Sequence, residues 1–327
     1  MKFEEFVRED EVWSAKSYRP GEPFYNKIEN LFTFSQAERK NIYEMMQHDM
    51  EFDQHIDDPG FVFEEQQLEK QQKEAVKELI LHLYDNLFRK GKFIFQSQPT
   101  GYEEFKNSLF EQNLSDICPA CLTWQTDLKD YGEVDHYFPK KSYPALTFHP
   151  INLAVVCSEC NGFLVKGEKD IYVTSNLTEL YIPYLRHAEK EVELGVKWIE
   201  EDGKDGEQEK VKKMVMVPRG LDVKLINKRI QNLDNLFSLS KRWTKRMNRI
   251  IEYELKHLQR KETLDEVVER IHNRTKEQKE RAEEDKTKLL EAATLEYIEN
   301  EGRQSFLDEW RERQKEKRIM SEFNADA

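Results

Sequence analysis

Four cysteines in a chain of 327 residues form two matched pairs. Cys118 and Cys121 make CPAC, Cys157 and Cys160 make CSEC, and 35 residues lie between the pairs. Each CxxC turn directs two sulfurs at one ion, and two such turns complete the tetrahedral thiolate shell that Zn²⁺ prefers. The spacing therefore predicts a structural Zn²⁺ site, which contributes to folding and is too fully coordinated to activate water.

An acid, a histidine and two asparagines lie between and beside these pairs. Asp135 and His136 belong to GEVDHYF, Asn152 precedes LAVV, and Asn161 directly follows Cys160. We expect short strands around Asp135 and Asn152, so that the neighbours Asp135 and His136 face opposite sides. One side chain can then bind a metal while the other faces substrate. Phosphodiester hydrolysis suits this set, because a hard cation takes oxygen ligands and a neutral imidazole accepts a proton from water.

The order CPAC, EVDHYFPK, HPINLAVVCSECN resembles the HNH endonucleases with a ββα-metal fold. It is most similar to the endonuclease VII-like branch, which has a four-cysteine zinc site followed directly by an asparagine. The resemblance covers about residues 115–170. It implies that His136 is the general base, that Asp135 and Asn161 bind a catalytic Mg²⁺ or Mn²⁺, and that Asn152 holds the loop that orients the base. Relatives also place a lysine after the final motif position, and here Lys166 is the candidate for phosphate contact, with Lys140 and Lys141 as competitors.

Each of these residues has an ordinary structural interpretation as well. A lone Asp-His pair occurs in capped loops, and Asn152 alone is a common turn residue. His149, in the loop before Asn152, is more typical of loop packing than of metal binding. We expect Glu133 to face solvent rather than to support the site.

The rest of the chain predicts an α+β, mainly helical fold with three regions. Charged residues make up 35% of the chain, while Gly and Pro number only 12 and 10, a composition typical of long helices with one wet face. We expect an acidic helical region at 1–112, the nuclease core with its zinc site at 113–180, and a β-hairpin followed by helices at 181–327.

Local patterns place several elements within these regions. Ser35 and Glu38 predict a capping box at the start of one helix, and an apolar stripe predicts a second helix within 66–90. The hairpin is expected within 191–218, and helices from Asp222 onward. A short helix is expected to begin at Ser158 and to run to about 169. The charge-laced sequence after 264 predicts a long solvent-exposed helix or helical hairpin, with an end that frays after residue 313.

One basic segment stands out in a protein of formal net charge −13. Residues 219–261 hold 12 Lys/Arg against 4 Asp/Glu. Its densest part predicts a helix that tracks nucleic-acid phosphates, and a merely solvated helix face is an equally weighted alternative. The candidate contacts are Lys241, Arg242, Lys245, Arg246 and Arg249.

Taken together, the leading hypothesis is a metal-dependent HNH endonuclease that cuts DNA, as the effector subunit of a bacterial defence system. A partner ATPase or sensor would control it, with the acidic N-terminal and charged C-terminal regions as docking surfaces. The alternative is a catalytically inactive, zinc-stabilised module that binds nucleic acid or protein. No base-reading motif separates DNA from RNA. We expect no membrane association and a cytoplasmic location, because no apolar run approaches the ~18 residues of a membrane span and the N-terminus lacks a signal-peptide stretch.

Overall fold

The computed structural model describes residues 21–90, 94–95, 98–99, 101–113, 118–122, 128–202, 207–258 and 262–323. The described residues form an α+β, mainly helical structure, which confirms the expected fold class. The helices are α2 Pro23–Phe32, α3 Gln36–Met50, α4 Lys70–His82, α5 Tyr102–Asn113, α6 Leu128–Tyr131, α7 Ser158–Asn161, α8 Val223–Phe237, α9 Leu239–His257, α10 Leu264–Glu284, α11 Leu289–Glu299 and α12 Arg303–Phe323. The strands are β1 Ile94–Phe95, β2 Gln98–Pro99, β3 Glu133–His136, β4 Leu153–Val156, β5 Val192–Asp202 and β6 Gln208–Pro218.

The chain divides into two compact units, which meet in sequence between Ala188 and Glu189, with Leu122 assigned to the second. The first unit holds α2 to α7 and the second holds β5, β6 and α8 to α12. The N-terminal part of the expected acidic region, residues 1–20, lies outside the described residues. Among the helices that the structure describes, none combines the length and the apolar character needed to cross a membrane.

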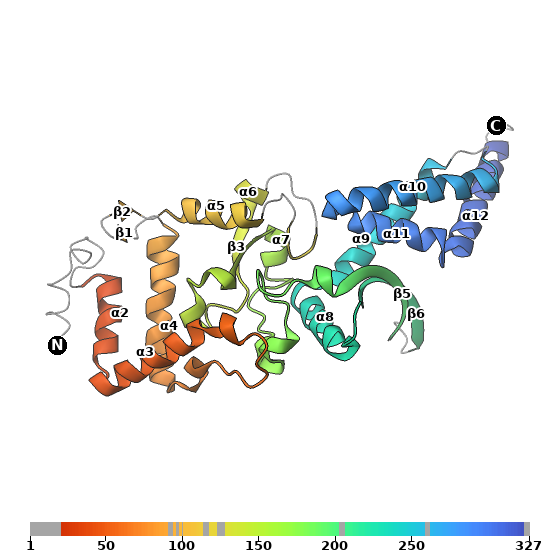
Figure 1. The fold of residues 1–327 in the computed structure, drawn as a ribbon. Coiled ribbons are helices and arrows are strands. Elements are labelled where there is room, and N and C mark those ends of the chain that lie inside the picture. Colours follow the sequence, from red (N-terminus) through yellow and green to blue (C-terminus); the bar gives the residue numbers. More distant parts are fainter. Residues whose placement is uncertain are drawn as a thin grey trace. The chain divides into compact units, whose positions relative to one another are not determined.

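Helices α3 and α4 build one side of the first unit (Figure 1). Ser35 and Glu38 form the predicted capping box at the start of α3, which satisfies backbone N–H groups that a helix start leaves unpaired. The helix expected within 66–90 is confirmed from Lys70, but its last part, Leu83–Phe88, winds as a π-helix. This wider turn places Tyr84, Leu87 and Phe88 in the interior.

An aromatic cluster forms the core next to these helices. The ring of Phe63 lies 5.3 Å from that of Phe138 and 4.8 Å from those of Tyr143 and Tyr172, and Phe52 meets Phe138 edge-on at 5.5 Å. Phe138 and Tyr143 belong to the loop that follows β3, so ring packing fixes this loop against the helical region. Edge-to-face pairs of this kind stabilise a core by about 0.5–1.5 kcal/mol each beyond area burial.

Strands β3 and β4 form a short antiparallel pair, with Asp135 opposite Ala154 and His136 opposite Leu153. Three of the four residues of β3 and all four of β4 are buried. A strand pair buried on both faces needs covering elements, and α5 packs against β4 on one side.

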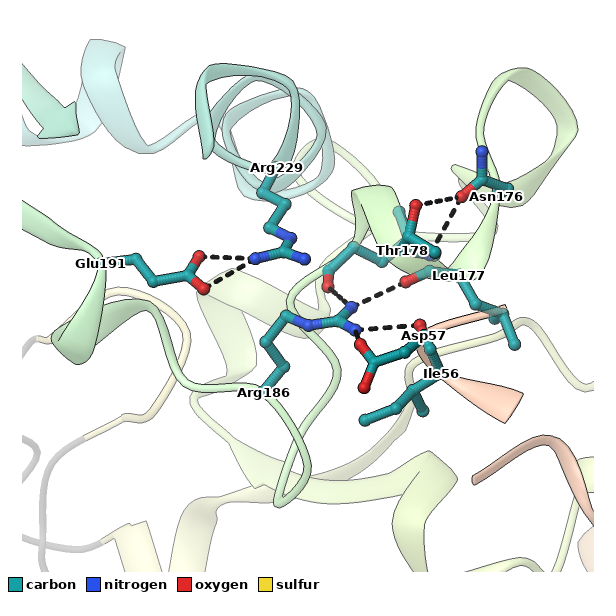
Figure 2. A network of polar contacts seen from close by, with 9 residues as sticks. Ile56, Asp57, Asn176, Leu177, Thr178, Arg186, Glu191 and Arg229 are labelled. Carbon is teal, nitrogen blue, oxygen red and sulfur yellow. Dashed lines mark hydrogen bonds and ion pairs between the residues drawn. The ribbon is translucent and has the colours of Figure 1, made fainter. Parts of the chain in front are cut away.

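Arg186 ties the end of the first unit to a distant loop (Figure 2). Its guanidinium donates to the carbonyl oxygens of Leu177, Leu180 and Ile56, at 2.8–2.9 Å, and to the carboxylate of Asp57 at 2.5 Å. One planar fork thereby satisfies four acceptors from segments about 130 residues apart in sequence, as expected for an arginine with five fixed donors.

The second unit is a long antiparallel hairpin packed against helices. β5 and β6 pair from Val192–Pro218 to Asp202–Gln208, which confirms the predicted hairpin. α8 and α9 pack against β6. α8 begins after Asp222, as expected, and the Asp222 carboxylate caps it by accepting the N–H of Leu225. The carboxylate of Glu191 accepts two hydrogen bonds from Arg229 of α8, at 2.7 and 2.8 Å (Figure 2).

The C-terminal helices differ from the expectation of a mainly solvent-exposed segment. Val267 and Ile271 of α10, Leu295 and Ile298 of α11, and Trp310 of α12 belong to one buried apolar cluster. Each helix contributes few apolar residues, but they lie on one face, so three charge-rich helices bury a shared core. Helix α12 spans Arg303–Phe323 and so includes the residues after 313 at which the end was expected to fray.

Candidate active site and metal centre

The four cysteines meet in one buried cluster within the first unit. Their sulfur atoms all lie within 4.8 Å of one another. The Sγ atoms of Cys118 and Cys160 are 3.7 Å apart, and those of Cys121 and Cys157 are 3.9 Å apart. Sulfurs at the corners of a tetrahedron around Zn²⁺, with Zn–S bonds of about 2.3 Å, are separated by roughly 3.8 Å. The cluster therefore fits a zinc ion in both size and ligand type.

The protonation of these thiols also agrees with a cation site. Hydrogen bonds among the crowded thiols raise the pKa of Cys118 and of Cys160 above the usual range, whereas hydrogen bonding from Cys118 lowers the pKa of Cys157 to about 7. Four thiolates cannot share so small a volume without a positive charge. A bound metal ion supplies that charge, so ion binding and thiol deprotonation are coupled.

The second cysteine pair also sets the end of β4 and the start of α7. Cys157 occupies the N-cap position of this helix without a side-chain cap, and the helix ends after one turn at Asn161, where Gly162 adopts an extended conformation. The expected helix from 158 to about 169 is therefore wrong beyond Asn161. Instead, the chain folds back, and the N–H of Lys166 donates to the carbonyl of Cys160 at 3.3 Å.

Asp135, His136, Asn161 and Lys166 line one cavity of about 180 Å³ in the first unit. Asp135 and His136, for which the sequence predicts opposite faces of β3, both line this cavity. Asn152 is fully buried and does not belong to the described lining residues.

His136 is held in one orientation and stays neutral. Its Nε2 lies 3.0 Å from the carbonyl oxygen of Thr147. Because a carbonyl only accepts, Nε2 carries the proton and Nδ1 holds the lone pair. Burial, followed by the nearby Lys140 ammonium, lowers the pKa of His136 to about 3. The ring also packs edge-on against Tyr84, at 4.8 Å between centroids.

Asp135 forms a buried ion pair with Lys166. The Nζ of Lys166 donates to Oδ1 of Asp135 at 2.7 Å and to the carbonyl oxygen of His136 at 2.6 Å. Lys166 is 1% exposed and Asp135 is 5% exposed. Burial raises the pKa of Asp135, and the ammonium of Lys166 opposes this shift. Lys166 thus lies inside the site, whereas the resemblance placed it at the substrate phosphate.

Asn161 and Glu133 contact each other at the cavity. The amide Nδ2 of Asn161 donates to Oε2 of Glu133, which leaves Oδ1 as the ligand atom of the amide. Glu133 is exposed, as expected, yet it lines the cavity and orients Asn161. The alternation along β3 contained the signal for this role, because Glu133 and Asp135 share one face of a strand.

Asn152 fixes the loop between the two strands. Its Nδ2 donates to the carbonyl oxygens of Phe138 and Leu146, at 3.1 and 3.0 Å, and its Oδ1 accepts from the N–H of Phe138 at 2.7 Å. These bonds hold the two ends of the loop that carries Thr147, the partner of His136. His149 of the same loop packs against Phe52 at 5.0 Å, as its interpretation as a loop-packing residue predicts.

Residues from outside the motif complete the cavity wall. Tyr84, Arg89 and Tyr102 line it, and the sequence contained no local signal for them, because they lie at least 30 residues before β3. Lys140 lies 4.6 Å from the Tyr84 ring and pairs with Asp85 at 2.5 Å. The π-helical turn that presents Tyr84 is a feature that often occurs at functional sites.

Lys141 also lines the cavity, where it forms an ion pair with Glu168. Both lysines that competed with Lys166 for the phosphate-contacting role are therefore at the cavity, and each has an acidic partner.

The predicted basic residues of the second unit lie along α9. Lys241, Lys245 and Arg249 are exposed, and no ion pair to a described residue holds them. Arg242 and Arg246 are half-buried, and Arg242 donates to the carbonyl of Phe237 at 3.4 Å. The opposite face of α9, with Trp243 and Met247, is buried. The C-terminal end of the basic segment, residues 259–261, lies outside the described residues.

In comparisons with known proteins, no family model, no curated protein and no solved structure matches the chain.

Proposed function

We propose that the chain is a metal-dependent HNH-type endonuclease that hydrolyses phosphodiester bonds, in DNA in the first instance. The observation that carries the proposal is a neutral His136, fixed by Thr147 beside Asp135 in one cavity. A general base must be unprotonated, oriented and close to the place where substrate binds. The strand pair β3–β4 followed by α7, next to the cysteine cluster, agrees with the ββα-metal fold that the sequence resembles.

The side chains then have distinct roles. The Nδ1 of His136 accepts a proton from the attacking water, while Thr147 holds the ring. Asp135, Asn161 and Glu133 contribute an all-oxygen set of the kind that Mg²⁺ and Mn²⁺ take. The ammonium of Lys166 occupies Oδ1 of Asp135, so a metal ion would displace it or bind through the other carboxylate oxygen. Such an ion would stabilise the charge that develops on the phosphate and on the leaving oxygen. Asn152 holds together the two ends of the loop that carries Thr147, the residue that orients His136.

A plasmid-nicking assay with Mg²⁺ or Mn²⁺ tests the proposal. We expect the wild-type chain to convert supercoiled plasmid to nicked product and His136→Ala to lose at least about 100-fold in rate, the usual contribution of a general base. His149→Ala is the matched control, because His149 lies in the same region and packs against Phe52. Equal rates for wild type and His136→Ala would eliminate His136 as the base.

The inactive zinc-stabilised module remains the second candidate, and one observation favours it. The Lys166–Asp135 pair is almost fully buried, which is also what a purely structural ion pair looks like. An inactive module predicts DNA binding by the wild type without nicking under any metal condition, and the same binding by His136→Ala.

Control by an ATPase or sensor is a separate proposal, supported by the charged surfaces on both units. It predicts that the purified chain nicks plasmid slowly or not at all until the partner is added. Full activity of the chain alone would contradict this control and leave the endonuclease proposal intact.

A further inference from the structure

Two large apolar side chains project into solvent beside the candidate site. Phe163 is 88% exposed and Leu164 is 91% exposed. They are the middle of the loop that joins Asn161 to Lys166, and both ends of this loop line the cavity. Adjacent large apolar residues with this exposure are costly in water and mark a contact surface when they sit at the rim of a site.

The loop holds this tip in a defined shape. The N–H groups of Val165 and Gly167 both donate to the carbonyl oxygen of Gly162, at 2.9 and 3.2 Å. Gly167 has a φ of +51°, and an added Cβ there would lie 3.1 Å from the carbonyl oxygen of Phe163. The loop is therefore closed by backbone bonds that need glycine at 167. The tip is presented outward and does not fold back onto the core.

Both ends of the loop are also anchored. On one side, Cys160 belongs to the cysteine cluster and accepts the N–H of Lys166. On the other, the Lys166 side chain is buried on Asp135. Anchoring removes most of the conformational entropy that an apolar tip would otherwise lose on binding, which is the advantage of a preorganised contact.

The tip lies close enough to the cavity to contact a substrate that is bound there. Phe163 lies two residues from Asn161, and Leu164 lies two residues from Lys166, so each Cα is within roughly 7 Å of a residue that lines the cavity. Successive bases of one strand are about 3.4 Å apart. A phosphodiester placed at Asp135 and His136 therefore brings its own bases, or those one or two steps away, to the tip.

The charges at the cavity agree with a nucleic-acid occupant. Arg89, Lys140, Lys141 and Lys166 line it together with Glu133, Asp135 and Glu168, which leaves an excess of one positive charge. The Arg89 side chain is 54% exposed and its ion pair with Asp85 is long, at 3.9 Å, so Arg89 is the lining cation best placed to attract a phosphate. The side chains of the tip carry no charge and no hydrogen-bond donor. Apolar side chains next to phosphate-binding cations are suited to base faces.

We propose that Phe163 and Leu164 form an apolar wedge that inserts among the bases next to the scissile phosphate and unstacks them. The wedge rests on the proposed endonuclease function. Unstacking a base step costs free energy, and stacking of a base on an aromatic ring offsets part of that cost. The wedge thus lets a duplex bend its backbone toward the cavity, and it acts on duplex more than on single-stranded DNA, whose bases are already free.

The test compares wild type with the double variant Phe163→Ala, Leu164→Ala. Val173→Ala is the matched control, because Val173 is 75% exposed in the same unit and does not line the cavity. The probes are a duplex with 2-aminopurine next to the cut site and the corresponding single strand. We expect the double variant to lose about tenfold in kcat/KM on the duplex and less than about threefold on the single strand, while Val173→Ala matches wild type.

Fluorescence gives a readout that does not need cleavage. Binding of wild type to the 2-aminopurine duplex should raise the fluorescence severalfold by unstacking the probe, and binding of the double variant should not. Equal fluorescence and equal kcat/KM for both proteins would overturn the wedge while leaving the endonuclease proposal standing. Absence of cleavage by wild type under any metal condition, with the fluorescence difference intact, would count against endonuclease activity of the chain alone and keep the wedge as a base-contacting element.

Discussion

The burial of Lys166 has a large energetic consequence in the first unit. A lysine with 1% exposure has almost no water around its charge. Its two acceptors, Oδ1 of Asp135 and the carbonyl of His136, compensate for that loss. A buried pair of this type often contributes little net stability, but removal of one partner leaves the other charge uncompensated. The pair therefore fixes the site geometry more than it stabilises the fold.

Substitution of one partner should show this asymmetry. Lys166→Met removes the ammonium and leaves a buried carboxylate, so we expect the free energy of unfolding to fall by about 3–5 kcal/mol. The double variant Lys166→Met, Asp135→Asn should be less destabilised than the sum of the two single variants, by at least about 1 kcal/mol. Urea unfolding followed by circular dichroism measures both. Lys140→Met is the control: its ion pair is partly exposed, so its loss should cost less than about 1 kcal/mol.

The four-cysteine cluster predicts that the chain binds zinc and depends on it for stability. We expect one zinc ion per chain by elemental analysis and loss of that ion in Cys157→Ser. Because structural zinc contributes several kcal/mol to folding, the Tm of Cys157→Ser should fall by about 10 °C or more. Ser158→Ala, at the exposed neighbouring position, should keep both the ion and the Tm. A Cys157→Ser protein that folds and retains one zinc ion would contradict the four-thiolate site.

At the scale of elements, a buried acid supports the loop that holds His136. The carboxylate of Glu65 accepts the N–H of Ala145 through Oε2 at 3.1 Å, two residues before Thr147, while its Oε1 has no hydrogen-bond partner in the described structure. Burial raises the pKa of Glu65 to about 8, and the charge of Asp49 adds to this shift while Lys73 opposes it. This acid is therefore largely protonated in the folded protein near neutral pH.

The raised pKa of Glu65 makes the stability of the fold depend on pH. The folded-state pKa of Glu65, about 8, lies above its ordinary value of 4.5. Between these values the unfolded state binds fewer protons than the folded state, so stability decreases as pH rises. Glu65→Gln cannot ionise and should escape this decrease. We expect the variant to be similar to wild type at pH 5 and more stable by on the order of 1–3 kcal/mol at pH 8.

Urea unfolding at both pH values measures the effect, with Glu64→Gln as the control on the same turn. A stability difference between Glu65→Gln and wild type that stays constant with pH would show that Glu65 does not titrate in this range.

Elements with local causes could be predicted from the sequence. The capping box of Ser35, the start of α8 at Asp222 and the β5–β6 hairpin depend on residues within a few positions of one another. The cysteine cluster was also predictable, because metal chemistry imposes its own spacing rule across 35 residues. The short length of α7 was not, since the chain after Gly162 is directed by the burial of Lys166.

In the candidate site, too, the residues of the local motif could be predicted and their distant partners could not. Asp135, His136 and Asn161 were named from the motif, and the structure brings them to one cavity. The partner of Lys166 lies 31 residues away, and that of Lys140 lies 55 residues away on a π-helical turn. Sequence periodicity reports which face of an element is apolar, and it does not report which distant polar group meets that face. Long-range polar pairs are therefore not predictable from sequence periodicity.

At the scale of the whole molecule, charge is distributed unevenly. The chain has a formal net charge of −13, and yet one face of α9 carries Lys241, Lys245 and Arg249 without an ion-pair partner in the described structure. Most other exposed cations of the C-terminal helices are paired, as Lys279 is with Glu296 at 2.7 Å. Because no carboxylate of the described structure neutralises these cations at i, i+4 and i+8, they can attract an external anion, and a polyanion with regularly spaced phosphates fits such a row.

The salt dependence of DNA binding tests this face. Each phosphate contact contributes about 0.9 to the slope of log K against log salt concentration for duplex DNA. The triple variant Lys241→Ala, Lys245→Ala, Arg249→Ala should therefore bind duplex more weakly, with the slope reduced by about 2.7. The loss should be the same for different sequences, because phosphate contacts do not read bases. Fluorescence anisotropy with a labelled duplex at several salt concentrations measures the slope.

A control with equal charge separates a specific row from the effect of net charge. Lys279, Arg281 and Lys315 lie on the same set of helices, and each pairs with a glutamate at 2.6–2.7 Å. Their replacement by alanine changes the net charge by the same amount. Since an ion-paired cation must first leave its partner to bind a phosphate, we expect this variant to keep the wild-type slope within about 0.5. Equal slope losses in both triple variants would assign the α9 face to general electrostatics and favour the solvated-face interpretation.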